Sequence, residues 1–266
     1  MYQSSPLALP NGAIDGYRTL PITGATFLTG YSTEYVMTLN SSKQVVQNYC
    51  AYNATTCTSS ILTDFVSNNV QISATDAYVK NYTAYLKRIY ALKTDGTVQL
   101  YQSSPLALPS GAIDGYRTLP ITGAKMISAY TTEDVLTINS SKQIVQYTCP
   151  YNATTCTSSI LTDFGSNNVQ VSGNSEYIKS YTTYLNRIYT LKADGTVQLY
   201  QASNINLPNG GVDGYRTLPI TGAKAIAAFG SEELLVLNSS NQVVKYSCLY
   251  NTTTCTSTIL TDFGTL

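Results

Sequence analysis

The sequence has no histidine and no tryptophan, and only 11% of its 266 residues are charged. Histidine is the commonest general base and the commonest metal ligand in proteins, so its absence excludes an ordinary Ser-His-Asp triad and any histidine-ligated zinc site. The 15 basic and 15 acidic residues balance, which argues against a nucleic-acid partner. No stretch approaches the roughly 18 apolar residues that a membrane span needs.

Other patterns that carry chemistry are missing as well. No pair of carboxylates suggests the arrangement of a glycosidase, and no segment has the spacing of a calcium-binding loop. We therefore expect no catalytic residues, no cofactor and no metal, and we predict that the protein is not an enzyme.

What the chain does have is a repeat of 99 residues. The segment Asp15–Gly24, which reads DGYRTLPITG, returns at Asp114–Gly123 and again at Asp213–Gly222. Self-similarity at a fixed period indicates a fold built by stacking one structural unit.

Each repeat divides into two related halves of about 49 residues. Short runs rich in Val, Ile, Thr and Tyr predict four strands in each half, and helical periodicity is absent. Asp95-Gly96 and Asp194-Gly195 are strong hairpin signals. A fourth run closes each half, at Ile61–Phe65 or at Leu106–Leu108. Four short strands in each half of about 49 residues predict an all-β, propeller-like fold of tandem four-stranded units, with an array of β-sandwich repeats as the alternative.

One strand–turn–strand segment carries a family resemblance. Leu92–Tyr101, LKTDGTVQLY, resembles repeats of the regulator-of-chromosome-condensation type of propeller and of lectin-like five-bladed propellers. The resemblance covers every half-repeat, but the chain lacks the Trp, His and additional Gly of those families. It implies a β-propeller and transfers no functional residue.

The repeat also predicts the domain organisation. Five blades are expected at residues 17–65, 66–115, 116–164, 165–214 and 215–263, followed by a tail at 264–266. Residues 1–16 match the end of the half that contains Asp-Gly, so they would form a surplus terminal strand. Three complete repeats would take 297 residues. The surplus strand is therefore expected to cap an edge locally, to pair with another chain, or to belong to a longer repetitive polypeptide.

The six cysteines fall into three identical Cys-x6-Cys pairs. An even count in local pairs indicates disulfides formed in an oxidising compartment. Closing so short a loop would stabilise the fold by about 2.5 kcal/mol per bridge. Zinc is a weak alternative at this spacing without histidine. The predicted bridges are Cys50–Cys57, Cys149–Cys156 and Cys248–Cys255.

Asn-x-Ser/Thr sequons recur with the cysteines. Three lie inside the cysteine loops, three lie in predicted hairpin turns, and one lies off the period. Such sites predict N-glycosylation at the surface of an extracellular or cell-surface protein. The candidate sites are Asn40, Asn53, Asn81, Asn139, Asn152, Asn238 and Asn251.

Two further recurring sets could bind a ligand or serve the fold. The aspartate and arginine of the DGYR segment are more typical of a turn with a salt bridge than of a ligand site, and the aspartate of each Leu-Thr-Asp-Phe segment is typical of a turn. Tyrosines of the Asp-Gly halves could stack on sugars or pack in half-buried positions. These residues are Asp15, Arg18, Asp114, Arg117, Asp213, Arg216, Asp64, Asp163, Asp262, Tyr82, Tyr85, Tyr90, Tyr181, Tyr184 and Tyr189.

Together these features predict a non-enzymatic extracellular structural protein, disulfide-pinned and N-glycosylated. Its expected partners are copies of itself in a head-to-tail assembly, as in a surface fibre or coat. The alternative is a lectin-like propeller that binds carbohydrate. The sequence leaves open the glycan type, the binding partner and whether the ring closes.

Overall fold

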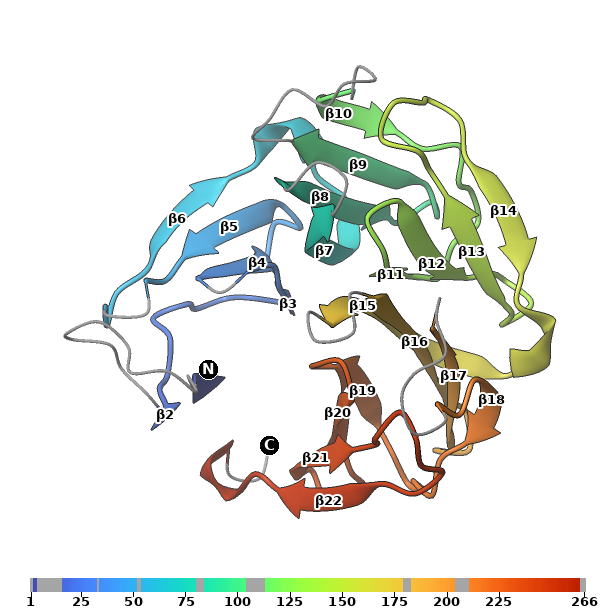
Figure 1. Cartoon of the computed structure of the whole chain (residues 1–266). Helices are drawn as coiled ribbons and strands as arrows, with labels where there is room; N and C mark the ends of the chain where they lie inside the picture. Colours follow the sequence, from blue (N-terminus) through green and yellow to red (C-terminus); the bar gives the residue numbers. More distant parts are fainter. Residues whose placement is uncertain are drawn as a thin grey trace.

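The computed structural model describes residues 2–3, 16–32, 34–51, 54–79, 84–103, 113–178, 183–203 and 211–263. Five four-stranded antiparallel sheets stand around a central axis, each with its first strand innermost (Figure 1). This arrangement is a β-propeller, so the alternative of β-sandwich repeats is wrong.

The five sheets are numbered here as blades 1 to 5 in chain order. Blades 1, 3 and 5 contain the cysteines and are called the disulfide blades, and blades 2 and 4 contain the Asp-Gly turns and are called the hairpin blades. Blade 1 consists of β3 (Phe27–Gly30), β4 (Tyr35–Leu39), β5 (Val45–Tyr49) and β6 (Thr58–Ile61). Blade 2 consists of β7 (Asn69–Val79), β8 (Ala84–Lys93), β9 (Val98–Ser103) and β10 (Gly115–Thr118). Blade 3 consists of β11 (Met126–Ala129), β12 (Asp134–Ile138), β13 (Ile144–Thr148) and β14 (Thr157–Ile160).

The last two blades repeat this plan. Blade 4 consists of β15 (Asn168–Ile178), β16 (Thr183–Lys192), β17 (Val197–Ser203) and β18 (Gly214–Thr217). Blade 5 consists of β19 (Ala225–Ala228), β20 (Glu233–Leu237), β21 (Val243–Ser247) and β22 (Thr256–Ile259). A short 3-10 turn follows each disulfide blade, at Thr63–Phe65, Thr162–Phe164 and Thr261–Phe263.

The outer strands lie elsewhere than the sequence predicts. In blade 2 the fourth strand is β10, which pairs with β9 and crosses the boundary expected after residue 115. Gly115 has a φ of 102°, a backbone conformation that glycine adopts readily as the chain enters this strand. The run Leu106–Leu108, expected to be that strand, lies outside the described residues. In blade 1 the strand ends at Ile61, and the chain then turns so that Phe65 is buried.

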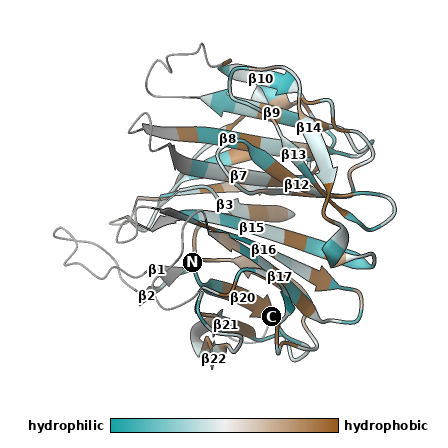
Figure 2. Cartoon of the chain, turned by 45° about the vertical axis from the view of Figure 1, so that its right-hand side comes forward, coloured by the Kyte–Doolittle hydropathy of each residue, from teal (hydrophilic) through white to brown (hydrophobic). Residues whose placement is uncertain are grey.

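The hydrophobic core is divided among the junctions between blades. Four clusters of buried residues each join two neighbouring blades, and Figure 2 shows hydrophobic segments on strands such as β8, β16 and β20. Every β-strand alternates its side chains between two faces, so each blade can pack against both neighbours. Most of the stability of such a fold therefore comes from contacts between adjacent units.

The N-terminal strand pairs within its own chain. β1 (Tyr2–Gln3) and β2 (Gly16–Tyr17) form a two-stranded sheet in which Tyr2 lies opposite Tyr17. Tyr101 and Tyr116 are paired in the same way in blade 2. The β1–β2 pair is therefore the outer half of a hairpin blade. The structure shows local pairing on one side of β1, and the alternatives of pairing with another chain and of a longer repetitive polypeptide stay predictions.

The two ends of the ring meet at an aromatic contact. Tyr17 lies edge-on to Phe263, with ring centroids 4.9 Å apart. The equivalent pair, Phe65 and Tyr116, has nearly the same geometry at 5.1 Å. The β1–β2 pair therefore lies beside blade 5 in the same way as β9 and β10 lie beside blade 1. Both chain ends lie on one side of the molecule (Figure 1).

Candidate functional site

A pocket of about 310 Å³ lies on blade 1 and is lined by aromatic and hydroxyl-bearing side chains. In the sheet, Tyr35 lies opposite Tyr49, Tyr49 lies opposite Thr58, and Gln47 lies opposite Ser60. Residues directly opposite each other in an antiparallel sheet point to the same face. The register therefore brings two tyrosines, an amide and two hydroxyls together. This group is called the tyrosine pocket below.

The rings of the tyrosine pocket form a tilted stack. Tyr35 and Tyr49 have centroids 5.0 Å apart, and Tyr31 approaches Tyr35 edge-on at 6.1 Å. The Tyr49 side chain is 37% exposed, so part of its ring faces solvent. Burial raises the pKa of Tyr31, and the charge of Asp76 raises it further. Tyr31 therefore stays a neutral hydrogen-bonding group at ordinary pH.

Blade 2 contributes charge beside these rings. Asp76 on β7 lies opposite Lys87 on β8. Burial raises the pKa of the Asp76 carboxyl, and Lys87 partly opposes this by lowering it. Oδ1 of Asp76 is buried without a hydrogen-bond partner in the described structure. The junction of blades 1 and 2 thus combines aromatic faces, hydroxyls and one partly desolvated acid.

Only blade 1 has tyrosines at these positions. In blade 3 the equivalents are Asp134 and Thr148, and the Thr148 hydroxyl donates to Oδ1 of Asp134 at 2.5 Å. In blade 5, Glu233 forms an ion pair of 2.9 Å with Lys245. Those copies use their polar groups on each other, whereas the pocket in blade 1 presents open ring and hydroxyl surface. The repeat has therefore diverged at these positions.

Such a pocket is suited to binding a small, polyhydroxylated molecule. Aromatic faces pack against the C–H surfaces of a sugar ring, while a few polar groups fix its orientation. Nothing in the tyrosine pocket could act as a nucleophile with an adjacent base. Its chemistry is that of recognition.

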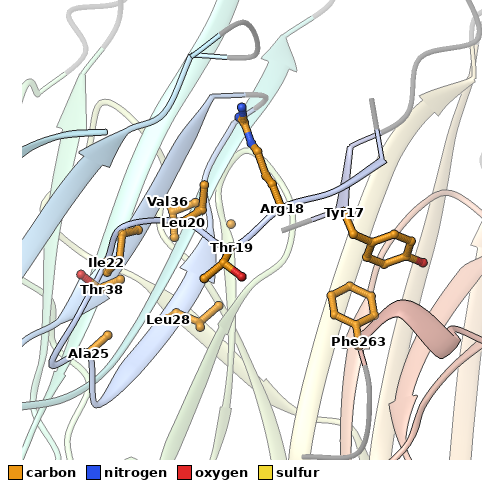
Figure 3. A pocket seen from close by; sticks show the side chains of 11 residues that line it. Tyr17, Arg18, Thr19, Leu20, Ile22, Ala25, Leu28, Val36, Thr38 and Phe263 are labelled. Carbon is orange, nitrogen blue, oxygen red and sulfur yellow. The ribbon is translucent and has the colours of Figure 1, made fainter. Parts of the chain in front are cut away.

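A second, larger cavity of about 670 Å³ lies between blade 1 and Phe263. Figure 3 shows Leu20, Leu28 and Val36 on one side of it and the rings of Tyr17 and Phe263 on the other. Its wall is mainly apolar, with the Arg18 side chain at its edge. Arg18 donates to the carbonyl of Ala54 at 2.5 Å, so its guanidinium is already engaged.

The structure contains the three predicted disulfides, and no cysteine is free. Of the predicted glycosylation sites, Asn152 is exposed within its cysteine loop and Asn251 is half-buried. In the turns, the side-chain amide of Asn40 donates to Gln44 at 3.0 Å, and the same bond recurs at Asn139 and Asn238. A glycan there would have to replace that hydrogen bond. Asn53 and Asn81 lie outside the described residues.

The tyrosines of the Asp-Gly halves were expected either to stack on sugars or to pack in the fold, and two of them pack. Tyr90 and Tyr189 are fully buried in the core, where Arg88 and Arg187 donate to their hydroxyls. Of the four other tyrosines of that set, Tyr184 is half-buried, Tyr82 and Tyr181 lie outside the described residues, and the Tyr85 side chain does not belong to the described part.

The DGYR segment does not form the expected ion pair in blade 2. Arg117 instead donates to the carbonyl of Ile113 at 3.0 Å and lies 3.4 Å from the side-chain oxygen of Gln102. Burial lowers the pKa of Arg117, and the charge of Arg88 lowers it further. The segment is therefore structural. The tyrosine pocket was missed because Tyr35 and Tyr49 break the repeat instead of following it.

Within the described residues, no helix is long and apolar enough to cross a bilayer, and no three His, Cys, Asp or Glu side chains gather where a metal ion could bind.

Comparison with known proteins gives the fold. No protein-family model and no curated protein matches the sequence. Among solved structures, SapL1 lectin in complex with α-methyl fucoside aligns at 13% identity and a TM-score of 0.53, over 88% of this chain and 77% of that one. A variant of AofleA from Arthrobotrys oligospora aligns at 10% identity and a TM-score of 0.60, over 92% and 77%. A variant of Aleuria aurantia lectin with α-methyl-L-fucoside aligns at 10% identity and a TM-score of 0.54, over 85% and 72%.

These likenesses agree with the resemblance to lectin-like propellers. At such low identity they show a shared β-propeller architecture.

Proposed function

We propose that this protein is an extracellular carbohydrate-binding propeller whose sugar site is the tyrosine pocket of blade 1. The observation that carries the proposal is the stack of Tyr35 and Tyr49 beside Gln47, Thr58 and Ser60. An exposed aromatic platform ringed by hydroxyl and amide groups is complementary to a neutral sugar. A formal net charge of zero suits a neutral ligand as well.

Two further observations support the proposal. The propeller aligns with lectins that were solved with a methyl fucoside bound. The three disulfides favour an oxidising, extracellular location. N-glycosylation belongs to the same proposal, and Asn152, exposed between Cys149 and Cys156, is its best-placed described site.

The test is binding of α-methyl fucoside by calorimetry, together with a glycan array to find other sugars. The decisive variant is Tyr49→Thr, because blade 3 carries Thr148 at this position and the substitution is therefore compatible with the fold. Loss of a stacking ring worth about 1.4 kcal/mol would weaken binding about tenfold.

The matched control is Tyr116→Thr. Tyr116 is equally exposed at 37% but lies on the outer strand of blade 2. Sugar binding should persist in this variant. Equal losses in both variants, or no sugar bound by the unaltered protein, would remove the tyrosine pocket as the site.

Assembly into a fibre or coat is a second candidate. β1 pairs with β2 on one side only, and its other edge, equivalent to the edge of β9 that pairs with β8, has no partner strand among the described residues. This edge and the exposed apolar wall of blade 1 are both available for a contact between copies. Sedimentation velocity over a wide range of protein concentration tests this candidate, since a species that stays monomeric throughout would end it.

A further inference from the structure

A hairpin blade precedes a disulfide blade at two complete junctions, between blades 2 and 3 and between blades 4 and 5. At both, the two inner strands of the hairpin blade pack on the first strand of the disulfide blade. A third junction of this kind lies in front of blade 1. There the described residues supply only the outer pair, β1–β2. The space where two inner strands would lie is called the open slot below.

Side chains facing the open slot are exposed where their copies are buried. Leu28 on β3 is 67% exposed, whereas Ile127 and Ile226, its equivalents, are 1% and 3% exposed. Ala25 is likewise exposed, although its copy Ala124 is buried. A large apolar side chain at a strand centre is normally covered in a propeller, so this wall has the composition of a junction without the neighbour that buries it.

The backbone of this wall lacks a partner that both copies have. The side-chain amide of Gln71 donates to the carbonyl of Ile127 at 2.8 Å and accepts from its N–H at 2.9 Å. Gln170 makes the same two bonds to Ile226, at 2.6 and 2.8 Å. No glutamine of the described part stands opposite Leu28. An inner strand with glutamine at this position would complete the pattern.

Two more contacts repeat at the filled junctions. Arg88 is fully buried and donates to the carbonyl of Cys149 at 2.8 Å, and the same bond recurs one period later. The Gly96 turn lies so close to Gly123 that an added Cβ would be 2.9 Å from its Cα. Neither contact has a counterpart in front of blade 1 among the described residues, because Arg88 lies on β8 and Gly96 lies in the turn that follows this strand.

The opposite wall of the open slot belongs to blade 5, and it is incomplete in the same way. Leu237, Val243 and Phe263 are half-buried, while their copies in blades 1 and 3 are fully buried. Blades 1 and 3 also accept a hydrogen bond from an asparagine of the hairpin blade that follows them. Asn69 of blade 2, for example, donates to the carbonyl of Lys43 in blade 1 at 2.8 Å. The cavity of about 670 Å³ runs along the slot from blade 1 to Phe263 (Figure 3).

We propose that the open slot binds a two-stranded β-hairpin with the residue pattern of Asn168–Lys192. This occupant is specified by two filled examples in the same molecule, each making the same asparagine, glutamine and arginine contacts. A second folded copy is a poorer donor, because its own hairpins are the buried inner strands of blades 2 and 4. The mode is strand addition at an exposed sheet edge, because the second strand of the hairpin would pair with β1 as β8 pairs with β9, while its faces would pack on blades 1 and 5.

The direct test uses a synthetic peptide of residues 168–196 and the full chain. We expect saturable one-to-one binding by calorimetry and a higher Tm of the chain, because a ligand of the folded state stabilises it. A peptide carrying Gln170→Leu and Arg187→Leu keeps the apolar residues and loses the specific donors. It should bind at least about tenfold more weakly, the equivalent of a lost pair of hydrogen bonds.

Chain variants locate the binding. Leu28→Asp should abolish peptide binding, and Ile160→Asp, at an exposed position on β14, should leave it unchanged. Tyr49→Thr should also leave it unchanged, so failure of the slot proposal and failure of the sugar proposal are distinguishable. The proposal is overturned if the free peptide does not bind and the fusion described next is not stabilised. It is likewise overturned if the two peptides bind equally well.

A covalent arm covers a peptide that is insoluble alone. Residues 168–198 are fused after Leu266, and the fusion should raise the Tm above that of the same fusion carrying Gln170→Leu and Arg187→Leu. Equal Tm values count against the proposal. Concentration-dependent dimers without peptide, abolished by Leu28→Asp, would assign the slot to a second copy and likewise overturn the proposed partner.

Discussion

β3 and β11 occupy the same place in the repeat, one period apart, yet their surroundings differ on the side of the preceding blade. β11 lies beneath the inner strands of blade 2, which bury Ile127, and the Gln71 side chain hydrogen-bonds its backbone. β3 faces the open slot, and Leu28 is the most exposed large hydrophobic residue of the described chain. The comparison shows that burial in a repeat protein is decided by the adjacent unit more than by the residue's own sequence.

Blade 1 also differs from its copies on the opposite face. There the tyrosine pocket replaces the hydrogen-bonded pair of blade 3 and the ion pair of blade 5. One face of blade 1 thus has an unusual neighbour and the other has unusual residues. The same blade therefore carries both proposed binding surfaces.

The largest expected difference comes from truncating the two equivalent residues. Ile127→Ala should cost about 2–5 kcal/mol, because it removes buried methyl groups and leaves a cavity in a packed junction. Leu28→Ala should change stability by no more than about 0.5 kcal/mol, since the side chain is already in solvent. Urea unfolding of the two variants measures both values.

A cost for Leu28→Ala as large as that for Ile127→Ala would show that the slot is filled in solution. The control is Ile226→Ala, which repeats the filled junction at blades 4 and 5 and should resemble Ile127→Ala.

The disulfides give a second, smaller difference. Replacing both cysteines of a bridge by serine should cost about 2.5 kcal/mol from the loop-closure term alone. The bridge at Cys149–Cys156 should cost more than the bridge at Cys50–Cys57, because the Cys149 carbonyl also accepts from the buried Arg88 and the backbone there must stay in place. Differential scanning calorimetry of the two double variants compares them. Identical Tm losses would mean that Arg88 does not depend on the bridge.

Much of the architecture could be predicted from spacing alone. The Asp-Gly turns, the fixed cysteine pairs and the 99-residue period indicate antiparallel four-stranded units, local bridges and tandem stacking, and all three are present. These features depend on contacts that are close in sequence, where turn chemistry and loop closure act directly.

The two sites could not be predicted in this way. The tyrosine pocket requires the register of three strands, which places Tyr35 opposite Tyr49, and repeat matching hides it because the copies lack tyrosine there. The open slot requires knowledge of how the ring ends meet. That depends on the contact of Tyr17 with Phe263, which are 246 positions apart in the sequence.

The smallest expected difference concerns two aspartates of blade 2, Asp76 and Asp95. Their contributions to folding stability change with pH in opposite directions. Burial raises the pKa of Asp76, and Lys87 only partly opposes this. Its carboxylate is thus less favourable in the folded than in the unfolded state, so stability falls as the pH rises from the unfolded pKa of about 3.9 through the raised folded pKa. Asp76→Asn should therefore raise the Tm at pH 7, by no more than about 3 °C for a half-exposed group, and leave it unchanged below about pH 3.

Asp95 is the matched case of opposite sign. The N–H and hydroxyl of Thr97 donate to its carboxylate and lower its pKa, so the folded state favours the charged form. Its stabilising contribution is present above the unfolded pKa and is lost as the pH falls through the folded pKa. Asp95→Asn should therefore lower the Tm at pH 7 and converge with the unaltered protein in acid. Thermal melts of both variants from pH 2 to pH 8 decide the comparison. If Asp76→Asn lowered the Tm at neutral pH as well, the attraction of the Lys87 charge would outweigh desolvation, and the carboxylate beside the tyrosine pocket would be a stabilised charge available to a ligand.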